Sequence, residues 1–154
     1  MELANFLDRN DVLLNVDVTS KKHLLQHLAD HVGSSSLLDA REVFSAILQR
    51  EKLGSTAVGA GVAIPHGKFR KLDRIVGCLA KLETPIDFDS IDGQPVDIVF
   101  LLLAPEDAGA DHLKALSRIA RALRDPARTA GIRAANTPEA LYSSLIEEPT
   151  SNAA

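Results

Sequence analysis

A histidine in a glycine-rich run is the residue of this chain whose setting best suits chemistry. His66 lies in the run Gly61–Lys68, where Pro65 fixes the backbone before it and Gly67 leaves its other side uncrowded. The run follows a short apolar segment, and α/β domains bind their ligands at such sheet edges. Neutral imidazole is a good nucleophile, and a reference pKa of about 6.5 keeps it plentiful at pH 7. We expect an exposed nucleophile, although a surface histidine without a role fits the spacing equally well.

His112 is the second candidate, at the start of an expected helix. The apolar residues that share its helical face are Leu116, Ile119 and Leu123. His112 should therefore face inward at the helix N-terminus, where the helix dipole favours an anion and disfavours imidazolium. It could donate a hydrogen bond to a phosphoryl group. A core-edge histidine satisfied by the backbone fits the same pattern.

Arg50 is the third candidate, and it lies where another expected helix ends near Gly54. A cation at a helix C-terminus is expected from the dipole alone, but a planar guanidinium also suits phosphate. Ser55 and Thr56 follow and could donate hydroxyl hydrogen bonds to the same anion. The chain has no Walker A pattern, no serine-hydrolase elbow and no dinucleotide fingerprint.

We expect no metal site and no cofactor. His23, His27 and His31 are spaced four apart on an expected helix, which allows two of them to share a metal, but no cysteine or acidic cluster supplies further ligands. They are better explained as residues at the boundary of the apolar face. Cys78 is the only cysteine, so no intramolecular disulfide can form, and its apolar surroundings predict a buried, inert thiol.

Composition indicates a protein of the cytoplasm. The chain has 154 residues, 45% of them hydrophobic and 25% charged, with a net charge of −4 and scattered Lys and Arg. These values predict neither a nucleic-acid footprint nor an anionic membrane surface as partner. The first residues lack the pattern of a signal peptide, and the longest apolar stretch, 98–104, is too short to cross a bilayer, so we expect no membrane insertion.

Apolar periodicity predicts a single α/β domain over residues 1–147, followed by a polar tail at 148–154. Strands are expected at 12–16, 62–64, 74–82 and 96–104, and helices at 20–31, from Asp39 to near Gly54, and at 111–123, 127–135 and 138–146. Apart from the strand at 62–64, residues 55–67 are expected to form a loop. A Ser-rich turn is expected to join the first two helices. The continuous apolar run at 96–104 predicts a central strand covered on both faces.

The third helix, 111–123, is expected to bury one apolar set. Its members are Leu113, Leu116, Ile119, Ala120 and Leu123. The last helix is expected to be capped by Thr137 with Pro138 at its first position. Helices on both faces of a buried strand make a three-layer arrangement.

Three segments together resemble one family. Arg50–Lys68, Thr84–Phe100 and Asp111–Ala120 are similar to the bacterial phosphotransferase-system IIA domains of the fructose/mannitol type. The similarity extends over essentially the whole chain up to the polar tail, and the segment around His66 is the most specific. The resemblance implies a mixed β-sheet flanked by helices on both faces.

The resemblance also implies roles. His66 matches the family's phosphorylated histidine, which receives its phosphoryl group from a small phosphocarrier protein of the HPr type. His112 matches the second active-site histidine, and Arg50 matches the active-site arginine. Such a protein is a phosphohistidine carrier rather than a conventional turnover enzyme.

Within the family the chain is most similar to the nitrogen-regulatory branch. That branch implies a regulator whose phosphorylation state governs contacts with targets such as potassium transport or sensor kinases. Two alternatives stay open: a sugar-uptake IIA component that passes its phosphoryl group to a IIB domain, and a binding module that acts independently of phosphorylation. The sequence leaves the regulated partner, the signalling form and the oligomeric state undetermined.

Overall fold

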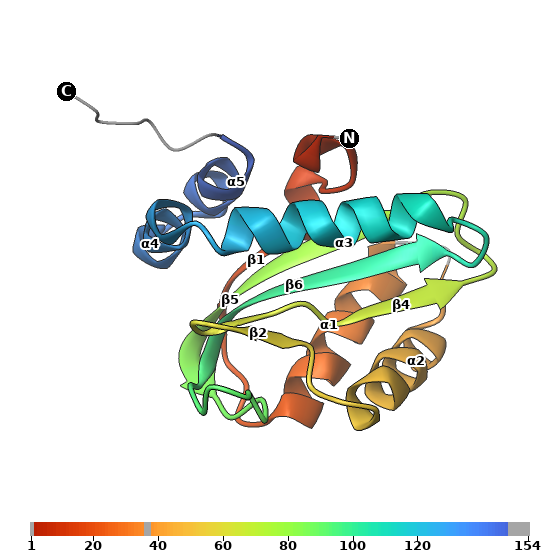
Figure 1. The fold of residues 1–154 in the computed structure, drawn as a ribbon, viewed down its shortest axis with the longest axis horizontal. Coiled ribbons are helices and arrows are strands. Elements are labelled where there is room, and N and C mark those ends of the chain that lie inside the picture. The colour runs from red at the N-terminus through yellow and green to blue at the C-terminus, as the bar shows by residue number, and fades with distance from the viewer. Residues whose placement is uncertain (1, 36–37, 148–154) are drawn as a thin grey trace.

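A computed structural model describes residues 2–35 and 38–147, and Figure 1 shows their arrangement. Two short 3-10 helices, η1 (Leu3–Asn5) and η2 (Arg9–Asp11), open the chain. The strands are β1 (Val12–Val16), β2 (Ala57–Gly59), β3 (Val62–Ala63), β4 (His66–Phe69), β5 (Val76–Ile86) and β6 (Val96–Pro105). The α-helices are α1 (Lys21–Ser35), α2 (Ala40–Lys52), α3 (Ala110–Leu123), α4 (Pro126–Ala134) and α5 (Pro138–Ile146).

The strands form one mixed sheet in the order β1-β5-β6-β3-β2, and β4 also pairs with β6. β6 is antiparallel to β5 but parallel to both β3 and β4, which follow one another along the same edge of β6. The parallel register of β4 sets His66 opposite Leu102. Within the described residues, the expected fold class is confirmed: a single α/β domain with a mixed six-stranded sheet and five α-helices.

The central strand β6 carries the core on both of its faces. Val99, Leu101 and Leu103 belong to one apolar cluster, which includes residues of α1 and α2. The alternate residues Ile98, Phe100 and Leu102 belong to a second cluster with residues of α3, α4 and α5. All six side chains are fully buried. Since successive strand residues point to opposite faces, two helical layers must cover the sheet, as Figure 1 shows.

Local signals set most helix starts correctly. The carboxylate of Asp39 accepts from the Arg41 N–H at the start of α2, and the Thr137 hydroxyl accepts from the Ala140 N–H before α5. α1 runs past its expected end to Ser35 and contains Gly33. Gly33 faces α2 closely, since a Cβ there would lie 2.8 Å from the Ala40 Cβ. The turn expected between these helices includes 36–37, and the tail is 148–154; both lie outside the described residues.

Three expectations about element bounds and faces are wrong. His66 opens a strand instead of lying in a loop, because β6 supplies a parallel partner that local sequence does not reveal. β5 continues through Pro85 to Ile86, across a shift in register after Lys81.

The third error concerns α3. Leu113 is 67% exposed, and the buried residues are His112, Ala115, Ile119, Ala122 and Leu123. Adjacent helix positions differ by about 100°, so the inward turn of His112 moves Leu113 out of the core. None of the helices in the described ranges is long and apolar enough to span a bilayer.

The double-sided core of β6 predicts matched losses from two adjacent truncations. Leu101→Ala and Leu102→Ala remove side chains from opposite faces, and each should lower the free energy of unfolding by about 2–5 kcal/mol. Urea denaturation followed by circular dichroism measures both. Ile91→Ala is the control, because Ile91 is 99% exposed and its truncation should change stability by less than about 0.5 kcal/mol. A negligible loss at either leucine would contradict the three-layer core.

Candidate functional site

His66 is presented by an edge strand. Among the described strands, β4 pairs with β6 alone, so it lies at an edge of the sheet. Paired residues of neighbouring strands point to the same face, and Leu102 packs on the α3 side, so His66 and Lys68 point to that side as well. Phe69 alternates into the opposite core. At Gly67 an added Cβ would lie 3.2 Å from the Phe69 ring, which explains the need for a glycine beside the histidine.

A single hydrogen bond fixes the tautomer of His66. Its Nδ1 lies 2.9 Å from the carbonyl oxygen of Ile64. A carbonyl oxygen only accepts hydrogen bonds, so Nδ1 carries the proton and donates it. When the ring is neutral, Nε2 therefore has the lone pair, and Nε2 is the atom of His66 that can act as a nucleophile.

His112 stands beside His66 in the first turn of α3. The ring centroids are 5.7 Å apart and the planes meet at 70°. His112 is only 5% exposed, and its Nδ1 has no hydrogen-bond partner among the described residues. Burial lowers the pKa of His112, and the nearby charges of His66 and Lys68 lower it further, so the ring stays neutral at pH 7. A neutral imidazole in this position can donate one N–H to an anion.

The N-terminus of α3 adds partial positive charge at the same place. Gly109 is its N-cap, and no side chain caps the helix, whereas α2, α4 and α5 carry Asp or Thr caps. The N–H groups of the first turn therefore lack a side-chain acceptor. His112 in this turn is held where an anion is favoured.

The structure brings Arg50 to the two histidines. All three line one cavity of about 540 Å³ between α2 and α3, and Lys68 lines it as well. The Arg50 Nη1 donates to the carbonyl oxygen of Gly54 at 2.9 Å, which holds the side chain across the end of α2. The cavity thus combines a nucleophile, a neutral donor and two cations, a combination that suits a phosphoryl group.

Ser55 and Thr56 do not line this cavity. The Ser55 hydroxyl donates to the carbonyl oxygen of Phe88 at 2.7 Å, and the Thr56 hydroxyl donates to the carboxylate of Glu51. Both hydroxyls hold the segment between α2 and β2 in place. Their assignment as phosphoryl ligands stays a prediction, which would require them to leave these acceptors.

Glu51 is a structural residue that the sequence analysis missed. It is 6% exposed, accepts from the Thr56 N–H at 3.1 Å, and lies 3.0 Å from the Lys21 ammonium group. This buried carboxylate joins the start of α1, the end of α2 and the chain that leads toward His66. A signal was present: Glu51 follows the buried Val43 and Ile47 at intervals of four, on the same helical face.

Lys68 was also missed as a site residue. It shares the face of His66 because side chains of a strand alternate with period two. The expectation of a loop around His66 concealed this relation.

Two of the other histidines, His31 and His23, form contacts away from the cavity. The His31 Nε2 lies 2.9 Å from the carboxylate of Asp11, and the His23 Nδ1 accepts from the Thr19 N–H. Over residues 2–35 and 38–147, no group of three or more His, Cys, Asp or Glu side chains is arranged to hold a metal ion. Cys78 is fully buried as expected, and burial raises the pKa of its thiol.

The surroundings of His112 predict its titration. Its pKa in the folded protein should lie below that of an ordinary histidine, and two-dimensional NMR of the imidazole nitrogens measures it. Lys68→Gln removes one repelling charge and should raise the midpoint. His112 contributes full stability above the ordinary histidine pKa and loses it as pH falls toward the depressed pKa, because the unfolded chain then binds the proton more readily. A midpoint at or above the ordinary value would contradict this picture.

The Glu51 contacts predict a second outcome. Glu51→Ala leaves Lys21 and the buried Thr56 N–H without their acceptor and should cost about 2–4 kcal/mol of stability. Glu51→Gln keeps an oxygen for Thr56 and should lose less. Chemical denaturation of both variants measures the difference. Equal stability of Glu51→Ala and the wild type would show that the contacts of Glu51 with Lys21 and Thr56 contribute little to stability.

The chain is similar to known proteins over nearly its whole length. Residues 5–148 match the family described as "Phosphoenolpyruvate-dependent sugar phosphotransferase system, EIIA 2". A nitrogen regulatory protein of Bradyrhizobium diazoefficiens is 53% identical over 153 residues, covering 99% of this chain and 100% of that protein. Another from Escherichia coli is 42% identical over 148 residues, covering 96% of this chain and 91% of its own length.

A solved structure shows the same fold. The crystal structure of the nitrogen regulatory protein IIA-Ntr from Neisseria meningitidis superposes with a TM-score of 0.88 at 33% identity, covering 93% of this chain and 98% of that one. The predicted resemblance is therefore confirmed. The chain belongs to the type 2 EIIA family of the phosphoenolpyruvate-dependent sugar phosphotransferase system, and it is similar over nearly its whole length to the nitrogen regulatory proteins of that family.

Proposed function

We propose that His66 is phosphorylated on Nε2 by an HPr-like phosphocarrier, and that the chain acts as a nitrogen-type regulatory IIA protein through its phosphorylation state. The observation that carries the proposal is the hydrogen bond from Nδ1 to Ile64, which leaves the Nε2 lone pair unused beside the cavity. Membership in a phosphotransferase family supplies the reaction type.

The transfer needs little covalent chemistry from the protein. Nε2 of His66 attacks the phosphorus of the donor phosphohistidine, a nitrogen–phosphorus bond forms, and the bond to the donor nitrogen breaks. The donor imidazole keeps the electron pair of that bond. The Nδ1 proton of His66 stays in place, and the Ile64 carbonyl stabilises the positive charge that develops on the ring.

The surrounding groups favour the added negative charge. Lys68 and Arg50 bring cations to the cavity, and neutral His112 can donate a hydrogen bond to a phosphoryl oxygen. The first turn of α3, which has no side-chain cap, adds the partial positive charge of a helix N-terminus. These groups are in position before transfer, so the protein loses little free energy to reorganisation.

The rim of the cavity suits a protein donor rather than a free metabolite. Leu53 is 85% exposed and Leu113 is 67% exposed, and they flank His66 from α2 and α3. Exposed apolar side chains around a polar centre are typical of protein docking sites. A phosphocarrier can cover both leucines while it presents its phosphohistidine to His66.

The regulatory role is supported by the similarity to whole proteins that carry the name nitrogen regulatory protein. We infer that the protein works in the cytoplasm and that its targets include systems such as potassium transport or sensor kinases. Transfer to a sugar-specific IIB domain is the alternative role, and the same labelled protein can test it.

Substitution of His66 tests the reaction. In a mixture of radiolabelled phosphoenolpyruvate, the general phosphotransferase enzyme and an HPr-like carrier, wild type should take up label and His66→Ala should take up none. His27→Ala is the matched control, since His27 is an exposed histidine on α1 and should label normally. Label on His66→Ala at the wild-type level would refute the assignment. Rapid passage of the label to a IIB domain would favour the sugar role.

Substitution of His112 tests the second histidine. His112→Ala should still be labelled but about 10²-fold more slowly, because a positioned donor to the transferring group is lost. Rapid-quench measurement of the transfer rate checks this, and circular dichroism confirms the fold. An unchanged rate would reduce His112 to a packing residue.

A further inference from the structure

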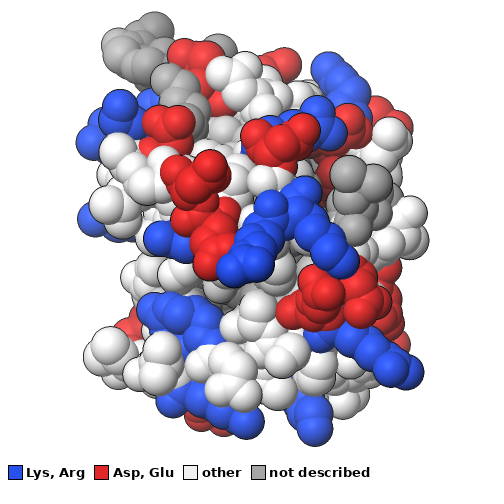
Figure 2. Space-filling model, turned by 90° about the vertical axis from the view of Figure 1, so that its right-hand side faces the viewer, with Lys and Arg blue, Asp and Glu red and all other residues white. Residues whose placement is uncertain are grey.

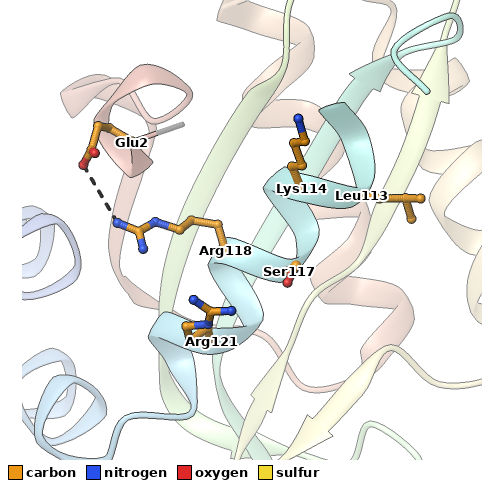
Figure 3. A pocket seen from close by; sticks show the side chains of 6 residues that line it. All are labelled: Glu2, Leu113, Lys114, Ser117, Arg118 and Arg121. Atoms are coloured by element: carbon orange, nitrogen blue, oxygen red, sulfur yellow. Dashed lines mark ion pairs between the residues drawn. The ribbon is translucent and has the colours of Figure 1, made fainter. Parts of the chain in front are cut away.

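The outer face of α3 carries a cationic stripe outside the His66 cavity. Lys114, Arg118 and Arg121 are separated by four and three residues, so they follow one side of the helix over about 10 Å. Figure 3 shows them around a hollow of about 540 Å³, whose other lining residues are Glu2, Leu113 and Ser117. The stripe is notable in a chain whose net charge is −4.

Arg118 is the cation of this stripe that lies near a carboxylate. Its Nη2 lies 3.9 Å from the carboxylate of Glu2, which is beyond hydrogen-bond distance, and its Nε has no hydrogen-bond partner in the part of the chain that the structure describes. Glu2 itself is 78% exposed in its side chain. The pair is therefore loose, and the guanidinium retains donors for a better-placed acceptor. The carboxylate of Glu2 shows which kind of group lies near the Arg118 guanidinium.

An apolar residue, Leu113, lines the same hollow as the three cations. Leu113 points to the opposite side of α3 from Arg118 in Figure 3, and it lines both this hollow and the cavity at His66. With 67% of its surface exposed, Leu113 offers an apolar contact next to three cations. A ligand that uses both must therefore combine negative charge with apolar side chains.

We propose that this face of α3 docks an acidic segment of a partner protein, with Glu or Asp side chains on Lys114, Arg118 and Arg121 and an apolar side chain on Leu113. The incoming carboxylate displaces Glu2 and takes the donors of Arg118. A partner seated here covers Leu113 and so touches the rim of the His66 cavity.

Two other anionic partners fit less well. A nucleic acid needs a continuous track of cations longer than the about 10 Å of this stripe. Figure 2 shows Lys and Arg interspersed with Asp and Glu on the side of the molecule that lies at the right in Figure 1, so the stripe does not continue as an unbroken cationic track over that side. A small phosphate-containing ligand needs donors that converge on one point, whereas these cations are spread along the helix. The linear arrangement favours an extended acidic segment or an acidic helix face.

Binding of a short fluorescent peptide, rich in glutamate with leucines interspersed, tests the proposal on the unphosphorylated full chain. The variant Lys114→Glu/Arg118→Glu/Arg121→Glu should bind about tenfold more weakly or worse, since each surface pair contributes about 0.2–1 kcal/mol. The matched control Lys22→Glu/Arg41→Glu/Lys52→Glu makes the same change in net charge at exposed positions of other helices and should bind nearly as well as wild type. Circular dichroism establishes that both variants fold.

The displacement of Glu2 gives a second, opposite effect. Glu2→Gln removes the competing carboxylate and should tighten binding of the same peptide about two- to threefold. Leu113→Ser should weaken the leucine-containing peptide but leave an all-glutamate peptide unaffected.

Competition distinguishes the other ligand classes. Inorganic phosphate and a short single-stranded oligonucleotide, at matched ionic strength, should fail to displace the peptide; displacement by either at comparable concentration would overturn the proposal in favour of a general anion site. Equal loss of binding in both triple variants, or none in the α3 variant, would also overturn it. Because no phosphorylation is involved, these outcomes do not depend on whether His66 carries a phosphoryl group.

Discussion

Burial of β6 on both faces is the constraint on which the rest of the structure depends. Its alternate side chains enter two separate apolar clusters, so the strand needs helices on either side and partner strands along both edges. The partner on one edge is split into β3 and β4, and the parallel register of β4 sets His66 against Leu102. The position of the reactive ring is thus a consequence of main-chain pairing to a buried strand. A ring held in this way keeps its orientation at little entropic cost.

Two buried polar groups, Glu51 and His112, refine that position. Glu51 stays paired because Lys21 and Thr56 approach it from α1 and from the segment before β2. His112 stays neutral because burial and the neighbouring His66 and Lys68 all oppose its protonation. The carboxylate fixes the frame of the site, and the neutral imidazole leaves an N–H for an anion.

The helix α3 contributes side chains to three different parts of the molecule. His112 and Ile119 face the core, Leu113 reaches the rim of the His66 cavity, and Arg118 lies on the outer side near Glu2. A helix presents a new direction about every 100°, so adjacent residues can belong to different functions. For this reason one short helix contributes to the core, to the rim of the His66 cavity and to the outer cationic face.

The sequence by itself determined the fold class, the central strand at 96–104, the start of α2 at Asp39, the cap of α5, and the inward face of His112, because these depend on local periodicity and capping. Its motifs also identified the family. Only the tertiary structure decided that His66 begins a strand, that Lys68 shares its face, that Leu113 is exposed, and that the hydroxyls of Ser55 and Thr56 bond away from the cavity. The strand at His66 and the Ser55 bond to Phe88 depend on contacts between residues distant in the chain, which local sequence patterns do not reveal.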